Sequence, residues 1–261
     1  MKDFIRSQLL RHGIWITKPT KQSEILALMS ELRPMYTPRK MSRFGPQGDG
    51  GYLMPDDLDG IGGCVSPGVS NNCGFDTHLA DLGINVHLAD ASVLCPPVWH
   101  DKFKFSKLYF DTYNSEETIT INEFCGNVSP GSDLILQMDI EGAEYRVLNS
   151  ASEELLSRFR IMVIEFHDLA QIFSPFGFRE ISSVFRKVLR SHNVVHIHPN
   201  NVASPVSRGS IVVPPIMEFT FYRKDRAAFE YRSLEYPHPL DVANVAERPN
   251  LMLPTCWHSA A

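Results

Sequence analysis

Short apolar runs alternate with helical segments along most of the chain, and this alternation restricts the fold more than any other feature. The run 134–138 (LILQM) is typical of a strand that is buried on both faces of a parallel sheet. Further strands are predicted at residues 62–65, 85–88, 107–110, 161–164, 194–197 and 219–222. Helices are predicted at residues 75–82, 143–148 and 181–189. Strands that alternate with helices indicate a doubly wound α/β sheet.

Segments of different character flank this region. Residues 1–40 are predicted to form a helical N-terminal extension, because apolar residues recur at helical spacing between positions 21 and 32. Residues 41–225 contain the alternating pattern and form the predicted ligand-binding domain. Residues 226–261 carry several prolines and little periodicity. We therefore expect them to form a C-terminal tail that packs on the domain.

Composition and charge exclude several classes of protein. The 261 residues carry 25 Lys and Arg against 30 Asp and Glu, a net charge of −5, so we expect no nucleic-acid partner. Apolar runs such as 160–166 fall far short of the roughly 20 residues that a membrane-spanning helix needs. The first residues lack the apolar core of a signal peptide. We expect a cytoplasmic protein without a membrane partner, and its oligomeric state stays open.

In an open parallel sheet, ligands bind beyond the carboxyl ends of the strands. A glycine-containing turn with Gly68 follows the first predicted strand, and the second strand ends at Asp90, 22 positions later. This distance is close to the roughly 20 residues that separate such a turn from the acid that binds ribose hydroxyls. The two residues together predict an adenosine site. For the turn alone, an ordinary connection between strand and helix is the alternative.

Three carboxylates follow the strand at 134–138, at Asp139, Glu141 and Glu144. Such clustering is costly unless the side chains face water or a cation. Asp139 and Glu141 are therefore predicted to be functional. Glu144 is interpreted as a residue of the first helical turn, where the helix dipole favours a negative charge.

Two further groups of polar residues follow the later strands. Glu165 and His167 alternate with Phe166 and should lie on the same side of their strand. A neighbouring carboxylate can hold a histidine ring in one tautomer, which prepares it as a general base. His198, Asn200 and Asn201 follow the next strand and suit a hydroxylated substrate. For the two asparagines, turn geometry is the alternative.

The segments LILQMDIEGAEYRVL and VIEFHD resemble the FkbM family of S-adenosylmethionine (SAM)-dependent methyltransferases. Upstream, FGPQGDGGYLMPDDL and FDTHLADLGINVHLADAS are similar to the variant of that family with an Asp-Gly-Gly-Tyr element before the first strand. The resemblance covers residues 43–223. It implies a seven-stranded Rossmann-like sheet of class I with an antiparallel last strand. It also implies methyl transfer from SAM to oxygen, with residues 41–225 as the methyltransferase domain.

Together, the resemblance and the residues predict a site. The Gly-x-Gly of class I methyltransferases is reduced here to Ser-Pro-Gly-Val-Ser, so the Asp-Gly-Gly-Tyr element is expected to cover the methionine end of SAM. The predicted cofactor residues are Asp49, Gly50, Gly51, Tyr52, Gly68, Asp90 and Asp139. His167 is the predicted base, oriented by Glu165, with Asp139 and Glu141 near the transferring methyl group. The acceptor is expected to be a small molecule or glycan, a sugar or another polyhydroxylated compound, contacted by His198, Asn200 and Asn201.

Three alternatives stay open. A divalent cation, Mg²⁺ or Mn²⁺, is the first, held by Asp139, Glu165 and His167. The second is a non-catalytic Rossmann-like protein that binds SAM or a nucleotide, because the glycine motif is reduced. The third is a nicotinamide-dependent oxidoreductase. The incomplete glycine fingerprint and the acidic strand ends, which repel a pyrophosphate, both disfavour it.

Overall fold

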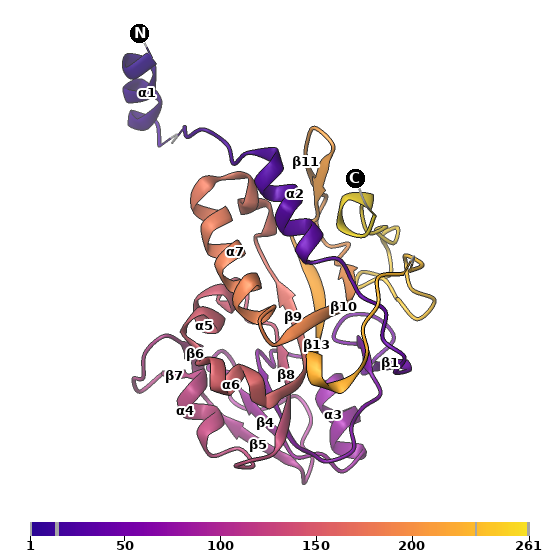
Figure 1. Cartoon of the computed structure of the whole chain (residues 1–261). Coiled ribbons are helices and arrows are strands. Elements are labelled where there is room, and N and C mark those ends of the chain that lie inside the picture. The colour runs from indigo at the N-terminus through magenta and orange to yellow at the C-terminus, as the bar shows by residue number, and fades with distance from the viewer. Residues whose placement is uncertain (1, 14–15, 233, 260–261) are drawn as a thin grey trace.

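A seven-stranded sheet forms the centre of the computed structural model, which describes residues 2–13, 16–232 and 234–259 (Figure 1). In spatial order the strands are β10 (His192–Pro199), β13 (Met217–Arg223), β9 (Phe159–Phe166), β8 (Asp133–Met138), β3 (Ile61–Pro67), β4 (Val86–Ala89) and β5 (Phe103–Ser106). β13 is antiparallel to both of its neighbours, and the strands from β9 to β5 pair in parallel. The predicted doubly wound sheet with an antiparallel last strand is confirmed.

The position of β13 separates this sheet from the usual dinucleotide-binding sheet. Numbered by their order along the chain, strands of that fold run 3-2-1-4-5-6 across the sheet. The present sheet has the same order, except that its seventh and last strand, β13, lies between the fifth (β9) and the sixth (β10). The strand order reverses between β3 and β8, because the chain first adds β4 and β5 on one side of β3 and then adds β8 and β9 on the other. Ligand-binding residues are therefore expected at the carboxyl ends of these strands.

Helices and a hairpin cover the two faces of the sheet. One hydrophobic core contains residues of α2 (Gln22–Glu31), α4 (Ile121–Gly126), α5 (Glu144–Ser150), α6 (Glu153–Arg158) and α7 (Pro175–Val188). The other contains residues of the hairpin β1 (Met41–Phe44) and β2 (Tyr52–Pro55) and of α3 (Gly74–Asp81). Residues of β8 alternate between the cores, because successive side chains of a strand point to opposite faces. Asp139 continues the row of Ile135 and Gln137, on the hairpin side.

The N-terminal and C-terminal segments differ in how they meet the sheet. α1 (Lys2–Arg11) lies apart from the sheet in Figure 1, whereas α2 packs into the first core through Ile25, Leu28 and Met29. Trp257, in the short 3-10 helix η3 (Thr255–Trp257), is fully buried, and its indole N–H donates to Val212 O at 2.9 Å. The tail thus contributes to the same core as α2. The division at residues 40 and 225 stays a prediction.

The remaining elements lie outside the main sheet. They are the hairpin β11 (Val206–Arg208) and β12 (Ile211–Val213), the parallel pair β6 (Tyr109–Asp111) and β7 (Thr118–Thr120), and the 3-10 helices η1 (Leu169–Phe173) and η2 (Lys224–Arg226). The strand predicted at residues 107–110 is therefore wrong as part of the sheet. β5, four residues earlier, pairs with all of β4, and the chain then leaves the sheet to form β6.

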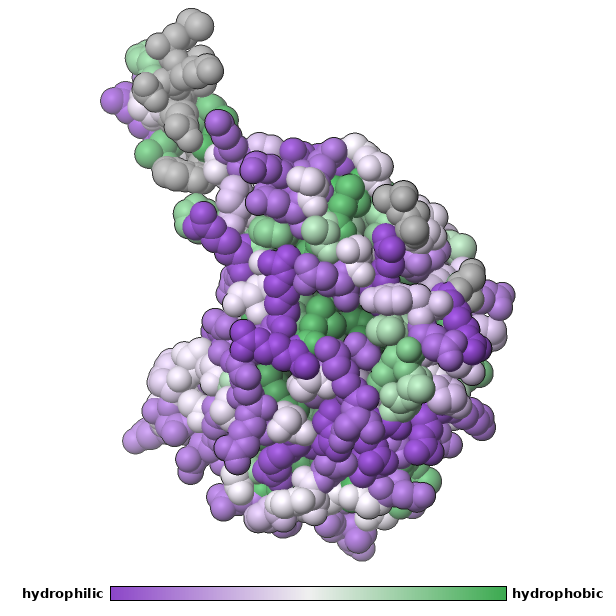
Figure 2. Space-filling model, viewed as in Figure 1, coloured by the Kyte–Doolittle hydropathy of each residue, from purple (hydrophilic) through white to green (hydrophobic). Residues whose placement is uncertain are grey.

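Hydrophilic residues cover most of the face in Figure 2, and hydrophobic ones form small separate patches. Within the described parts of the chain, no helix combines the length and the apolarity needed to cross a membrane.

Candidate active site

The chain turns sharply after three neighbouring strands, at one edge of the sheet. Ser70, Glu141 and Asp168 follow β3, β8 and β9, and all have positive φ angles, of 45°, 54° and 54°. Only one other non-glycine residue among those described, Ser129, has a positive φ. Left-handed conformations cost about 1–3 kcal/mol and concentrate at functional sites. The strained turns therefore mark the carboxyl edge of the sheet as the candidate site.

Gly68 allows the turns after β3 and β8 to pass close to each other. Its φ is +92°, and a Cβ atom at this position would lie 1.6 Å from the carbonyl oxygen of Asp139. No side chain fits there. The N–H of Gly68 donates to Ala89 O at 3.0 Å and is therefore engaged within the protein. Gly68 thus shapes the site through the space it leaves, rather than through a free amide.

Two adjoining cavities lie at this edge and share Gly68, Ser70, Asp139 and Glu141. The larger has a volume of about 420 Å³ and extends to Asp90, and the smaller has about 210 Å³. Other residues that line the larger cavity include Ala89, Ser92, Tyr109, Phe110, Ile140 and Arg146, and those of the smaller include Asp49, Gly50, Tyr52, Asn72 and Asp76. All the predicted cofactor residues except Gly51 thus line one cavity or the other.

Asp90 is held firmly by the surrounding backbone. Its Oδ2 accepts from Ser70 N at 2.8 Å, and its Oδ1 accepts from the N–H and the hydroxyl of Ser92 at 2.7 and 2.6 Å. A carboxylate offers about four acceptor positions. Asp90 therefore keeps one position for a ligand, and a second if the Ser92 hydroxyl rotates away.

The Asp-Gly-Gly-Tyr element forms a tight loop beside the smaller cavity. Asn72 Nδ2 donates to Asp49 O at 2.9 Å, and Asn244 Nδ2 lies 3.3 Å from Asp49 Oδ1. Gly50 has a φ of +74°, and a Cβ atom on it would lie 2.3 Å from Asn72 Nδ2. A Cβ atom on Gly51 would lie 2.1 Å from Pro46 O. Both glycines are therefore required by close packing of this loop.

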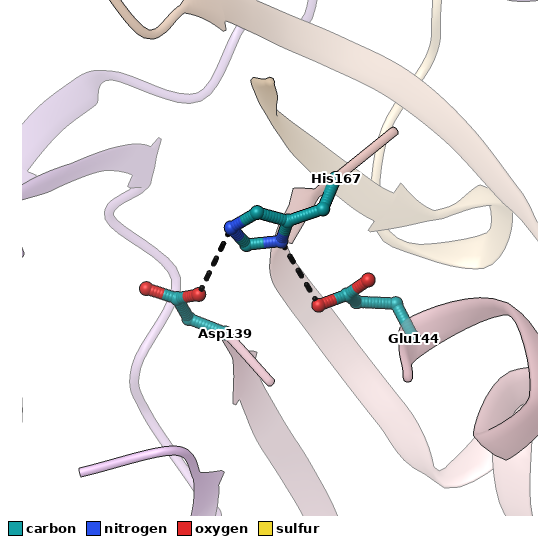
Figure 3. A group of neighbouring side chains, drawn as sticks. All are labelled: Asp139, Glu144 and His167. Carbon is teal, nitrogen blue, oxygen red and sulfur yellow. Dashed lines mark hydrogen bonds and ion pairs between the residues drawn. The ribbon is translucent and has the colours of Figure 1, made fainter. Parts of the chain in front are cut away.

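His167 lies among four carboxylates. Its Nδ1 is 3.1 Å from Glu144 Oε1, and its Nε2 is 3.4 Å from Glu141 Oε2, 3.7 Å from Glu165 Oε1 and 3.8 Å from Asp139 Oδ1. Figure 3 shows the ring between Asp139 and Glu144, with one nitrogen toward each. The structure thus brings together all four residues predicted to be catalytic.

The carboxylate that hydrogen-bonds the ring is Glu144, not Glu165 as the strand alternation suggested. Glu144 is completely buried, and its Oε1 also accepts from Ile140 N and Gly142 N, both at 3.1 Å. Gly142, with a φ of +96°, reverses the chain so that Glu144 returns beneath the strand end. The sequence signal for this contact was the glycine between the two glutamates, which indicates a tight turn but not its direction.

The charges of the cluster shift the pKa values of its members. Burial raises the pKa of Asp139 to about 7, opposed by His167 and reinforced by Glu141, Glu144 and Asp49. Burial alone would lower the pKa of His167, but the hydrogen bond and charge of Glu144, with Asp139 and Glu141, raise it above its ordinary value. Asp139 Oδ1 is buried and has no hydrogen-bond partner. The site therefore has groups that can exchange a proton near neutral pH.

Asp139, Glu144 and His167 offer ligand atoms that all lie within 4.8 Å of one another, a grouping that a metal ion can use. The two carboxylates, however, face opposite nitrogens of the ring, as Figure 3 shows. Asp139 and Glu144 therefore lie on different sides of the ring, and Glu144 hydrogen-bonds Nδ1. Asp139, Glu141 and Glu165 all face Nε2, so the predicted metal ligands Asp139, Glu165 and His167 lie together and the metal alternative stays open.

The residues predicted to contact the acceptor are buried and engaged elsewhere in the protein. Asn201 Nδ2 donates to Val245 O at 2.9 Å, and its Oδ1 accepts from Val245 N at 2.8 Å, so it holds the C-terminal tail. Asn200 Nδ2 donates to Glu165 Oε1 at 3.2 Å. His198 Nδ1 lies 3.6 Å from Asp241 Oδ2. None of the three lines either cavity, and their contact with an acceptor stays a prediction.

The strand order, with the antiparallel strand inserted beside β9, is that of a seven-stranded Rossmann-like methyltransferase sheet. Residues 97–195 match the family described as the methyltransferase FkbM domain. The resemblance to this family is thus confirmed over these residues. The matched segment includes Asp139, Glu144 and His167, and it begins after Asp90.

Solved structures with a similar fold are distant in sequence. A candidate RNA methyltransferase from Pyrococcus horikoshii is 14% identical, with a TM-score of 0.35, over 78% of this chain and 99% of that one. The 1,6-didemethyltoxoflavin N1-methyltransferase of Burkholderia thailandensis, solved with S-adenosylhomocysteine, is 13% identical, with a TM-score of 0.31, over 85% of this chain and 86% of that one. No curated protein matches the chain in sequence.

Proposed function

We propose that this protein is a SAM-dependent O-methyltransferase that acts on a hydroxyl of a sugar or another polyhydroxylated small molecule. The observation that carries the proposal is the pair of adjoining cavities that share Gly68, Ser70, Asp139 and Glu141. A ligand that is elongated and polar at both ends suits this shape. SAM, with adenosine at one end and an amino acid at the other, is such a ligand.

The larger cavity suits adenosine. Ala89, Phe110 and Ile140 provide an apolar surface for a planar base, and Asp90 provides an acceptor for a ribose hydroxyl. The carboxylate of Asp90 disfavours a phosphate at the same position, because like charges repel. This preference distinguishes SAM from a phosphorylated dinucleotide.

The smaller cavity suits a cation. Four carboxyl groups line it, and neither Lys nor Arg does so among the described residues; the four are Asp49, Asp76, Asp139 and Glu141. The sulfonium and the ammonium of SAM are both positively charged. Asp139, whose Oδ1 is buried without a hydrogen bond, gains an attractive contact from either group. A pyrophosphate would be repelled from the same place.

Bound SAM would supply a methyl group that its positive sulfur activates toward a nucleophile. The chain's own part is to hold the acceptor in line and to remove the hydroxyl proton. We assign the proton to His167 Nε2, because Glu144 occupies Nδ1 and fixes the ring. Glu141 and Asp139, which line both cavities, lie within 4 Å of that nitrogen and stabilise the imidazolium that forms.

Titration calorimetry tests the cofactor. We expect SAM to bind the wild-type protein, and Asp90→Ala to weaken binding by about 10–100-fold, the value of a hydrogen bond to a charged group. Glu154→Gln is the matched control, because Glu154 is exposed on α6, before the first residue of β9. A melting curve of Asp90→Ala verifies that the variant folds. Binding of NAD in preference to SAM would refute the proposal.

The acceptor is tested by release of S-adenosylhomocysteine in the presence of individual sugars and polyols, with amines and nitrogen heterocycles as comparison substrates. We expect turnover with a hydroxylated compound and methylation at oxygen, seen by mass spectrometry and NMR of the product. Methylation of nitrogen only would contradict the oxygen assignment. SAM binding without turnover of any compound would favour the non-catalytic alternative.

A further inference from the structure

A row of ionisable side chains extends from the candidate active site across the sheet. Glu165 of β9 is the direct cross-strand partner of Glu218 of β13, and Glu218 is the partner of His198 of β10. Met138, the last residue of β8, pairs with Ile164 of β9. The next residues of the two chain segments, Asp139 and Glu165, therefore lie beside each other. The row lies on the hairpin side of the sheet. Directly opposed side chains on neighbouring strands have Cβ atoms about 5 Å apart.

The row begins at the active site itself. His167 Nε2 lies 3.8 Å from Asp139 Oδ1 and 3.7 Å from Glu165 Oε1, so one ring nitrogen contacts the first two members. Asp139 lines both cavities, and Glu165 and Glu218 are buried beside it with 5% exposure each. Solvent therefore screens little of the electrostatic interaction between a charge in the cavities and the buried carboxyl groups of Glu165 and Glu218.

The basic side chains near the two glutamates are mostly histidines: His167 Nε2 lies 3.7 Å from Glu165 Oε1, and His198, Arg43 and His196 act on Glu218. Glu165 Oε1 accepts from Asn200 Nδ2 at 3.2 Å, and Glu218 Oε1 accepts from Asn244 Nδ2 at 2.7 Å. Within residues 2–13, 16–232 and 234–259, neither forms an ion pair with Lys or Arg. Two buried carboxylates at opposed cross-strand positions repel each other, which favours the protonated form of either one.

Charged and titratable groups face the row from each element packed against it. They are Glu141 and Glu144 before and in α5, His167 after β9, Asp49 in the hairpin loop, Arg43 and Tyr52 on the hairpin strands, His196 on β10, and Asp241 in the tail. The only guanidinium in this set is that of Arg43, which donates to Pro46 O and Gly48 O. Negative charge thus predominates around the row.

We propose that Asp139, Glu165 and Glu218 match the charge of the site to that of its ligand, releasing a proton to solvent when a sulfonium binds and taking one up when a neutral thioether replaces it. The inference rests on the proposed function and adds specificity to it. Glu165 and Glu218 are then residues that set the preference for donor over product. They act through Asp139, and Glu218 is a positioning residue.

The titration behaviour of the three carboxyl groups supports the proposal. Burial raises the pKa of Asp139 to about 7, burial and Asp139 raise that of Glu165 well above its ordinary value, and burial raises that of Glu218, with His198 opposing. A cation nearby favours the ionised form and lowers these pKa values. If the pKa of Asp139 falls from 7 to 6, about 0.4 proton is released at pH 7.

Calorimetric titrations at pH 7 test this inference without knowledge of the acceptor. SAM and S-adenosylhomocysteine are each titrated in phosphate, HEPES and Tris, whose ionisation enthalpies differ. The slope of the observed enthalpy against the ionisation enthalpy gives the number of protons released. We expect SAM to release about 0.4 proton or more beyond S-adenosylhomocysteine. The same measurement is made on Glu165→Gln and Glu218→Gln, which remove one charge each and keep the side-chain shape, and on the control Glu154→Gln.

We expect the difference in proton release between SAM and S-adenosylhomocysteine to shrink in Glu165→Gln and in Glu218→Gln. Removal of a like charge leaves the remaining carboxyl groups already ionised before SAM binds. The control should retain the wild-type difference. Comparing variants cancels protons exchanged by the amino group of SAM itself. Equal proton release for the two ligands in the wild-type protein would overturn the inference while leaving SAM binding intact. Failure of both ligands to bind would instead refute the proposed function.

Discussion

The hydrogen bond between Glu144 and His167 allows a sharp prediction, because the substitution Glu144→Gln changes the charge and little else. Glu144 Oε1 accepts from Ile140 N, Gly142 N and His167 Nδ1, and an amide oxygen can accept from the same three donors. The turn should therefore survive. A truncation such as Glu144→Ala would instead leave two amides without this acceptor, at about 1–3 kcal/mol each.

The expected effect is on the pKa of His167. A hydrogen bond to a charged group contributes about 1.5–3 kcal/mol and one between neutral groups about 0.5–1.5 kcal/mol. Glu144 is completely buried, so solvent does not screen this difference. The difference is about 1 to 1.5 kcal/mol, which corresponds to about one pKa unit. Because Glu144 raises the pKa of His167, the substitution should lower it by about that amount.

NMR titration of the His167 Cε1–H signal measures this shift directly, and Glu154→Gln is the control. The sign follows from the role proposed for the ring: a base works when deprotonated, so activity rises as pH increases through its pKa. In Glu144→Gln the acid side of the kcat/KM profile should therefore move about one unit toward lower pH. An unchanged or increased pKa in a variant with a normal melting temperature would refute the reasoning.

Three further predictions concern the same site. His167→Ala should retain SAM affinity within a few-fold but lose about 10²–10⁴-fold in turnover, and turnover near the wild-type rate would remove His167 from the mechanism. Gly68→Ala should destabilise the protein by at least about 2 kcal/mol, visible as a lower melting temperature, because the added Cβ atom meets Asp139 O at 1.6 Å in a left-handed backbone. EDTA should leave activity unchanged, since a His167 Nε2 that takes the hydroxyl proton cannot also bind a metal ion; loss of activity that Mg²⁺ restores would establish the metal alternative, in which Asp139 and Glu165 face that nitrogen.

Much of the sheet could be predicted, because buried parallel strands need continuous apolar runs. The third strand could not be placed, because residues 103–105 and 108–110 have similar apolar character. The choice between them depends on contacts with β4, which pairs with residues 103–106 along its full length. Local pattern carries no information about such a contact. The error is of the kind expected when tertiary pairing overrides strand propensity.

The histidine and asparagine side chains at the end of β10 and directly after it gave a weaker signal of a ligand site. Asn201 has the donors and acceptors that a sugar needs, but the backbone of the C-terminal tail needs them as well. The sequence of the tail has little periodicity, so the path that brings Val245 to Asn201 could not be foreseen. A polar residue after a strand thus indicates a buried partner of some kind, and only the structure distinguishes a ligand from a distant segment of the chain.

The acidic block after β8 contains one acid that is held by groups of the protein itself, Glu144, and one that faces the cavities, Asp139. Glu144 is held on Oε1 by two backbone amides and the His167 ring, while its Oε2 is buried without a hydrogen bond. Asp139, five positions earlier, has an Oδ1 that is buried without a hydrogen bond, and the rest of its side chain faces both cavities. An unpaired buried carboxyl oxygen costs free energy that the fold itself does not recover. A cationic ligand in the adjoining cavities would recover it at Asp139, which lines both cavities, but not at Glu144, which lines neither. This difference between two acids of one motif is the physical argument for a sulfonium at Asp139.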